Sequence, residues 1–449
     1  MTAARPLWQA YVFFLMPMML SNVLQSLFGT INGIYLGQMI GVDALAAASI
    51  FFPVMFFFIS FIIGLGAGSS VLIGQAWGAR ATGKAKAIAG TTLALTLLGG
   101  GVIAIGGGVF ARHLMVALAT PPNILDAATD YARIMMITMP ATFTFLLATA
   151  MMRGVGDTVT PLWALAISTA IGLVVTPALI QGWFGLPRLG VASAAIAAAV
   201  SSVVTLLWLG IHMRRMNHPL APDAVLVSAM RLDRELLGKV LRIGVPTAVQ
   251  LVVMSLAEIV LLGLVNGFGS DATAAYGAVN QVLSYVQFPA ISIAITASIF
   301  AAQAIGAGDN ERIGAIIRTG MWLNFLLTGG LVALGYLLSR LIIGLFITSP
   351  AVLDLAQTLL FIVVWSTVPF GMATVYSATM RASGTVLVPT LLSILAIIVV
   401  EVPVAVVLSR QIGVEGIWIA YPAVFCTMMV LQMGFYRMVW RKREIKRLI

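Results

Sequence analysis

Two carboxylates lie well inside long apolar stretches of this chain, Glu258 within residues 241–267 and Glu401 within residues 387–409. At 1.5 Å per helical residue, each lies about 20–25 Å from the start of its stretch. If the stretches cross a membrane, an ionised side chain at that depth costs on the order of 2.5–3.5 kcal/mol and calls for a reason. Apolar surroundings disfavour the ionised form of a carboxylic acid, and such a residue can act as a reversible proton carrier.

A structural role is the alternative for both carboxylates. Each could stay protonated and join two helices through a hydrogen bond, for example to Asn280 or Gln281, which would contribute roughly 0.6–2 kcal/mol. The sequence leaves both roles open for Glu258 and for Glu401. If the two side chains lie close together, they will titrate as a coupled pair.

Further polar and aromatic residues inside the apolar stretches are candidates for contact with a small molecule. Polar residues in membrane helices also join helices, and aromatic residues and the 23 methionines also serve as packing, so each candidate has a structural alternative. The candidates for substrate binding are Gln25, Asn32, Gln250, Asn280, Gln281, Tyr285, Trp365 and Tyr376.

The composition places these residues in a lipid environment. Hydrophobic residues make up 61% of the 449 residues and charged residues 9%, which excludes an ordinary soluble protein. Only helices satisfy all backbone polar groups within one apolar run, so the sequence predicts an all-α integral membrane protein. The twelve predicted spans are 8–38, 46–76, 87–111, 127–151, 160–182, 190–213, 241–267, 274–304, 314–342, 353–379, 387–409 and 413–438.

The positive charges predict the orientation of these spans. If both ends of the chain are cytoplasmic, twenty of the 25 Lys and Arg residues fall in or beside cytoplasmic segments and five on the other side. A multi-pass protein of the inner (plasma) membrane with both termini in the cytoplasm is therefore expected. The net charge of +10 then reflects a cytoplasmic face that meets anionic lipid, and a nucleic-acid partner is not expected.

The residues that usually carry enzyme or metal chemistry are scarce. His113, His212 and His218 lie at the ends of spans or between them, and Cys426 lies inside a span, so we expect no catalytic pair and no metal site. The glycines of residues 99–108 are not followed by a Lys-Ser or Lys-Thr pair and do not form a phosphate-binding loop. The sequence therefore predicts a protein that is not an enzyme, needs no cofactor and, if it pumps, runs on an ion gradient.

The chain repeats itself at an offset of 228 residues. Residues 41–47 return as 269–275, Gln75 returns as Gln303, and Met152-Arg153 returns as Met380-Arg381. Because each half contains six predicted spans, both halves share one orientation in the membrane. We therefore predict an N-terminal lobe over 1–213, a cytoplasmic linker over 214–240 and a C-terminal lobe with a basic tail over 241–449, with the lobes related by a pseudo-twofold axis around a central cleft.

Several ordered motifs together resemble the multidrug and toxic compound extrusion (MATE) family. They are Pro17 and Asn32-Gly33 leading into residues 41–47, Gly78-Ala79-Arg80 and Gly306-Ala307-Gly308, the Met-Arg turns before Pro161 and Pro389, and residues 190–197. The resemblance covers about the whole chain. It implies a twelve-helix antiporter that expels amphiphilic, usually cationic compounds in exchange for protons or sodium by alternating access.

The chain departs from the family pattern in its first lobe. Many bacterial members that resemble it carry an aspartate at the position of Asn32 and another just before the proline of Thr176-Pro177. Asn and Thr can coordinate a cation through oxygen but cannot release a proton near neutral pH. The ion-coupling residues are therefore expected in the second lobe, at Glu258 and Glu401. Members of the family often carry an arginine at the position of Glu401.

A flippase for a lipid-linked oligosaccharide or another amphiphilic lipid is the alternative function within the same superfamily. Such flippases usually have extra spans and several cations in the cleft, whereas this chain has twelve predicted spans and no Lys or Arg deep inside one. Drug export is the favoured function. The expected partners are small amphiphilic or cationic substrates, protons or Na⁺ and the bilayer, with the protein acting as a monomer.

Overall fold

Twelve long helices make up the protein, as expected. A computed structural model describes residues 6–347 and 349–449, and no strand occurs among them. Among these residues, twelve helices are long and apolar enough to cross a membrane, from Leu7–Ile40 near the N-terminus to Val414–Lys442. The predicted all-α membrane architecture is confirmed.

Helices of the first half follow the expected order along the chain, with short irregular helices at their ends. They are α1 (Leu7–Ile34), the π-helix η1 (Tyr35–Ile40), α2 (Val42–Gly78), α3 (Thr82–Ala117), α4 (Leu125–Gly154), α5 (Val159–Gln181), the 3-10 helix η2 (Trp183–Gly185), α6 (Ala192–Arg215) and the short α7 (Ala224–Ser228).

Helices of the second half include two spans that are broken in the middle. They are α8 (Arg234–Asn266), α9 (Ser270–Ala307), α10 (Arg312–Leu337), α11 (Ser339–Gly344), α12 (Pro350–Val363), the 3-10 helix η3 (Val364–Ser366), α13 (Thr367–Ala382), α14 (Leu387–Ala396), the π-helix η4 (Ile397–Glu401), α15 (Val402–Ile412), α16 (Val414–Met438) and the 3-10 helix η5 (Trp440–Lys442).

Prolines account for both breaks. A proline has no N–H to donate to the carbonyl four residues earlier, so Pro369 frees the carbonyl of Trp365 and Pro403 frees that of Val399. The 3-10 segment η3 contains Trp365, and the π-helical segment η4 contains Val399 and ends at Glu401. The backbone is therefore irregular at the point where Glu401 enters the bundle.

Two compact units divide the chain. One comprises residues 1–19, 78–80 and 245–449, and the other comprises residues 20–77 and 81–244. The boundaries fall inside α1 after Met19 and inside α8 after Gly244, close to Pro17 and Pro246. The division into lobes 1–213 and 241–449 with the linker 214–240, drawn from the repeat, remains a prediction.

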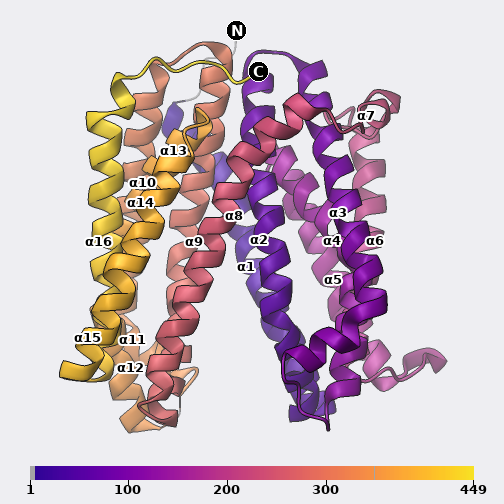
Figure 1. The fold of residues 1–449 in the computed structure, drawn as a ribbon, viewed down its shortest axis with the longest axis vertical. Coiled ribbons are helices and arrows are strands. Elements are labelled where there is room, and N and C mark those ends of the chain that lie inside the picture. Colours follow the sequence, from indigo (N-terminus) through magenta and orange to yellow (C-terminus); the bar gives the residue numbers. More distant parts are fainter. Residues whose placement is uncertain (1–5, 348) are drawn as a thin grey trace. The chain divides into compact units, whose positions relative to one another are not determined.

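The unit that contains residues 245–449 is packed around α9 and α13. Contacts join α13 to α9, α10 and α16, and these helices run side by side in Figure 1. Its core includes Trp418, Tyr421 and Phe425 from α16 and Tyr276 from α9. This unit contains both embedded carboxylates.

The unit that contains residues 81–244 holds the polar segment after α6 by an ion pair and a histidine–aspartate contact. The ammonium of Lys86 on α3 binds the carboxylate of Asp223, and His218 Nε2 lies 3.5 Å from Asp157 Oδ2 in the α4–α5 turn. The Lys86 hydrogen bond, together with the Leu226 N–H donated to Asp223 Oδ1, holds the pKa of Asp223 below its usual value. Asp223 thus both caps α7 and fastens it to α3.

Replacement of Asp223 should destabilise the protein in a pH-dependent way. Asp223→Asn keeps an acceptor for the Leu226 N–H but loses the charge that binds Lys86. Because the folded-state pKa is depressed, this contribution is present above about pH 4 and is lost as the pH falls through the folded pKa. We expect a thermal midpoint a few degrees below wild type at pH 7, with the difference shrinking below about pH 4.

The matched control is Asp233→Asn. Asp233 also accepts backbone N–H groups at the start of a helix but makes no ion pair among the described residues. Its replacement removes a capping carboxylate without breaking an ion pair. If Asp223→Asn lowers the thermal midpoint by the same amount at pH 7 and below about pH 4, the stabilisation does not come from the ion pair with Lys86.

Candidate functional site

Glu401 is a buried carboxylate at an irregular point of its helix. It is the last residue of η4, two residues before Pro403, and only 6% of its surface is exposed. A π-helical turn inside an α-helix is often found at a functional site because it redirects a side chain. Here it turns a carboxylate into the core of the unit.

Glu258 lies on α8, eight residues or about 12 Å before the end of that helix at Asn266. Its side chain is exposed, while its neighbours Ala257 and Leu261 are buried in the core of the unit. Glu258 is close enough to Glu401 to interact with it electrostatically. The structure therefore places in one unit the two carboxylates that the sequence predicted for ion coupling, one exposed and one buried.

Two tyrosines lie beside this carboxylate pair. The hydroxyls of Tyr276 on α9 and Tyr421 on α16 are 3.2 Å apart and form a hydrogen bond in the core. Each hydroxyl also interacts electrostatically with both Glu258 and Glu401. The side chain of Asn280, one turn after Tyr276, is a hydrogen-bond partner of the Tyr276 hydroxyl.

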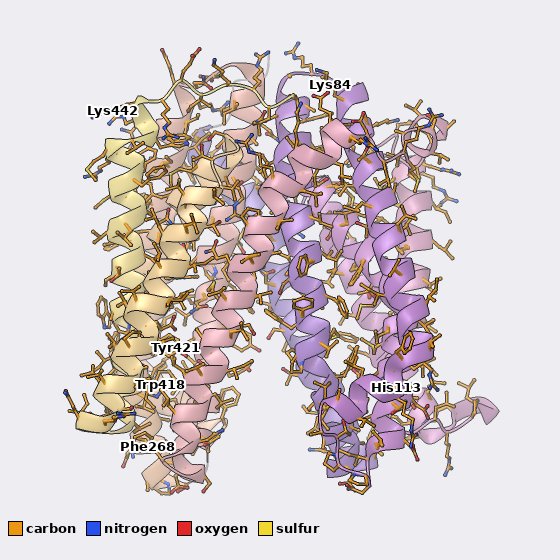
Figure 2. The ribbon with its side chains drawn as sticks, viewed as in Figure 1. Lys84, His113, Phe268, Trp418, Tyr421 and Lys442 are labelled. Atoms are coloured by element: carbon orange, nitrogen blue, oxygen red, sulfur yellow. The ribbon has the colours of Figure 1, made fainter. Side chains whose placement is uncertain are left out.

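Trp418 fixes the two phenol rings. Its ring centroid lies 5.2 Å from that of Tyr276 and 5.5 Å from that of Tyr421, and none of its surface is exposed. The indole Nε1–H has no acceptor among the described residues. Figure 2 shows Trp418 and Tyr421 toward one end of α16, and Lys442 beyond its other end.

Close packing of α15 against α16 sets this geometry. A Cβ on Gly416 would collide with the backbone carbonyl of Leu408, so only glycine allows the two helices to approach this closely at that point. α16 also contacts η4. The glycine therefore helps to hold Tyr421 and Trp418 next to the segment that carries Glu401.

The remaining candidates in this unit differ in burial and in what they pack against. Gln250 and Gln281 are half-buried on α8 and α9, and Tyr285 is half-buried with its ring 5.5 Å from that of Phe288. Tyr376 packs against Tyr436, fifteen residues or about 22 Å along α16 from Tyr421. Tyr376 therefore does not share the site of Glu401, and Trp365 is 43% exposed in η3.

The other unit brings together the two positions at which the family pattern has aspartates. The Thr176 hydroxyl donates a 3.3 Å hydrogen bond to Asn32 Oδ1, and Thr176 is fully buried. Gln25, two turns before Asn32 on α1, is exposed. The described residues contain no group of three His, Cys, Asp or Glu side chains that could hold a metal ion.

Tyr276, Tyr421 and Trp418 were not among the site residues predicted from the sequence. Each has a hydrogen-bond donor on its side chain and lies within an apolar helix, and a polar side chain within an apolar helix was the reason for choosing Asn280. The sequence could not show that α9 and α16 bring two hydroxyls together across 145 residues of chain. The resulting cluster of two carboxylates and two hydroxyls can accept, hold and release protons, and its carboxylates can bind a cation.

Comparisons with known proteins agree on the family. The MatE family model matches residues 17–178 and 246–407. The probable multidrug resistance protein YoeA of Bacillus subtilis is 46% identical over 444 residues, covering 98% of this chain and 96% of that protein. An FAD transporter of Shewanella oneidensis is 26% identical over 85% of this chain and 84% of its own.

A solved structure has the same fold. A mutant of the MATE transporter VcmN of Vibrio cholerae superimposes with a TM-score of 0.89 over 98% of both chains, at 18% sequence identity. The matched regions of the family model start at Pro17 and Pro246, so the family unit coincides with the internal repeat. The chain belongs to the MATE family and is a multi-pass membrane transporter of small compounds, not an enzyme.

Proposed function

We propose that this protein exports amphiphilic, mostly cationic compounds across the inner membrane in exchange for protons, with Glu258 as the coupling residue. The observation that carries the proposal is the pairing of an accessible carboxylate, Glu258, with a buried one, Glu401, inside one unit of the transporter. The relation to multidrug resistance proteins supports drug export as the process.

The charge of the site favours cations as substrates. Two carboxylates attract a cation and repel an anion, and the low dielectric of a membrane protein strengthens both effects relative to water. A protein that is 26% identical to this chain is an FAD transporter, and FAD carries phosphate groups. An acidic site of this kind suits organic cations better than such an anion.

Proton coupling follows from competition at one carboxylate. Protonation of Glu258 from outside neutralises it and weakens its hold on a bound cation, and deprotonation toward the cytoplasm restores the charge for the next one. By linkage, proton and cation each lower the apparent affinity for the other by the same factor. Sodium is the weaker option because Asn32 and Thr176 replace the aspartates of the first-lobe pattern.

The exchange uses alternating access between two pseudo-equivalent lobes, as the internal repeat suggests. The excess of Lys and Arg on the segments assigned to the cytoplasm supports cytoplasmic termini. In this orientation Glu258, Tyr276 and Tyr421 lie in the outer half of the membrane, since each is within about 9–12 Å of the non-cytoplasmic end of its helix.

Replacement of Glu258 tests the proposal most simply. Glu258→Gln has nearly the shape of the protonated residue but cannot release a proton. We expect export driven by a pH gradient to fall at least about tenfold and the remaining activity to lose its pH dependence, as measured with a fluorescent organic cation in proteoliposomes.

The control for this variant is Glu235→Gln. Glu235 lies in the first turn of the same helix and pairs with Lys239 at the surface, so its loss should leave export close to wild type. Folding of both variants is checked by gel filtration in detergent. Normal export by Glu258→Gln would end the proposal.

Replacement of Asn32 should change the affinity for substrate more than the pH dependence of export. Asn32 has no ionisable group, and its side-chain oxygen accepts the Thr176 hydroxyl. We expect Asn32→Ala to change the apparent substrate affinity by roughly twofold to tenfold, the range of one hydrogen bond. The midpoint of the pH profile of export should stay where it is in wild type.

Thr176→Val distinguishes the effect of losing the Thr176–Asn32 hydrogen bond from the effect of losing the Asn32 amide, because it removes only the hydroxyl donor. Asn32→Asp adds an acid to this unit and should add a second pH-dependent step. A pH profile that collapses in Asn32→Ala would show that the first half of the chain carries the coupling.

A further inference from the structure

The chain that follows α16 is fastened across the ends of other helices of its own unit. We call residues 439–449 the basic strap. Trp440, near its start, donates its indole N–H to Ser383 Oγ at 3.1 Å, in the turn between α13 and α14. Trp440 is 3% exposed and stacks on Tyr436, with ring centroids 5.4 Å apart. Figure 1 shows the strap, in yellow, leaving the end of α16.

The strap next contacts the turn between α9 and α10. Asn310 donates its side-chain amide to the backbone carbonyl of Ile445 at 3.3 Å. A Cβ on Gly308, the residue that follows the last turn of α9, would lie 2.9 Å from Arg447 Nη2. The Arg447 guanidinium therefore lies at the C-terminal end of α9, where the helix dipole favours a positive charge.

Leu448 returns the strap to the turn between α13 and α14. A Cβ on Gly384 would lie 2.9 Å from a methyl carbon of Leu448, which is half-buried. Gly384 also has a φ of +80°, so glycine serves both the turn and the space that Leu448 fills. The strap is thus held at three points, which fixes the position of its outer face.

The outer face of the strap is strongly basic. Glu444 lies 3.8 Å from Lys446, which is the one ion pair of the strap among the described residues. Each Lys or Arg near an anionic membrane surface strengthens binding to it about fivefold. The exposed cations are Arg441, Lys442, Arg443 and Lys446.

From this geometry we propose that the basic strap binds the phosphate headgroup of an anionic phospholipid. The strap touches the ends of α9, α13 and α16, which are parts of membrane spans, so its cations lie where headgroups begin. Arg441 and Arg443 can each donate two parallel hydrogen bonds to a phosphate. A zwitterionic headgroup offsets its phosphate with an ammonium group, so an anionic lipid is the better partner.

The inference goes beyond export and uses the proposed orientation only to assign the lipid to the cytoplasmic leaflet. Because the strap joins the α9–α10 turn to the α13–α14 turn, a lipid bound to it stabilises the unit that contains Glu258 and Glu401. A ligand that binds only the folded protein raises its stability by mass action. The composition of the membrane would therefore act on the unit that contains the candidate site.

A lipid titration of the intact protein in detergent tests the proposal. Dioctanoyl phosphatidylglycerol is the probe, dioctanoyl phosphatidylcholine is the zwitterionic reference, and native mass spectrometry counts the bound lipid. We expect the tightest phosphatidylglycerol to bind at least about tenfold more strongly than phosphatidylcholine, since two or more cations contribute about fivefold each. Replacement of all four exposed strap cations should abolish this preference. That variant combines Arg441→Gln, Lys442→Gln, Arg443→Gln and Lys446→Gln.

A matched control removes the same charge elsewhere. The control replaces four exposed arginines at the end of α6, before α8 and within α8, none of which makes an ion pair among the described residues. It should keep the phosphatidylglycerol affinity within about twofold of wild type, because these residues lie outside the strap. The control combines Arg215→Gln, Arg231→Gln, Arg234→Gln and Arg242→Gln.

A second variant keeps every charge and releases the strap. Asn310→Ala combined with Ser383→Ala removes the two hydrogen bonds that hold it. We expect the phosphatidylglycerol affinity to fall about fivefold or more, the range of one to two hydrogen bonds. Thermal midpoints measured without lipid verify that all variants fold.

Four results would overturn the proposal. Equal binding of the two lipids by wild type would exclude an anionic-lipid site, and equal loss in the control would assign the attraction to the whole basic surface. Unchanged affinity after release of the strap would show that the fastened geometry plays no part. Displacement of the lipid by inorganic phosphate at the same concentration would assign the site to free phosphate. None of these measurements uses transport, so each result leaves the proposed export untouched.

Discussion

The unfavourable free energy of a carboxylate in an apolar helix bundle governs the functional part of this protein. A membrane protein with 9% charged residues has few polar groups with which to compensate such a charge. The structure places Glu401 in the core and Glu258 at its edge, with two tyrosine hydroxyls and an asparagine beside them. Neutral hydroxyl and amide groups can in general hydrogen-bond both a charged and an uncharged carboxyl group.

Backbone irregularity is the means by which the fold brings these groups together. Pro403 removes one helical hydrogen bond, and the helix passes through a π-helical segment that ends at Glu401. Gly416 allows α16 to approach α15 closely, which helps to set Tyr421 and Trp418 beside that segment. The same residues that weaken regular helices thus build the site, while the regular apolar helices supply the surroundings that make its chemistry possible.

The fold and the two carboxylates of the candidate site could be predicted from the sequence, for identifiable reasons. Long apolar runs can only be helices in a bilayer, so the twelve spans followed directly, and an acid inside such a run is conspicuous. Contacts between distant helices leave no periodic signal, which is why the Tyr276–Tyr421 hydrogen bond and the packing of Tyr376 on Tyr436 could not be predicted. The breaks at η3 and η4 were also missed, because a proline shows where a helix can bend but not whether it forms a 3-10 or a π turn.

The central claim is that proton movement through the second half of the chain drives export, and separately imposed ion gradients test it most directly. Wild-type protein in proteoliposomes would be given a pH gradient in the absence of sodium, and then a sodium gradient with the pH clamped on both sides. We expect the pH gradient alone to drive accumulation of an organic cation and the sodium gradient alone to drive none. Accumulation driven by sodium at clamped pH, with none driven by pH, would contradict it.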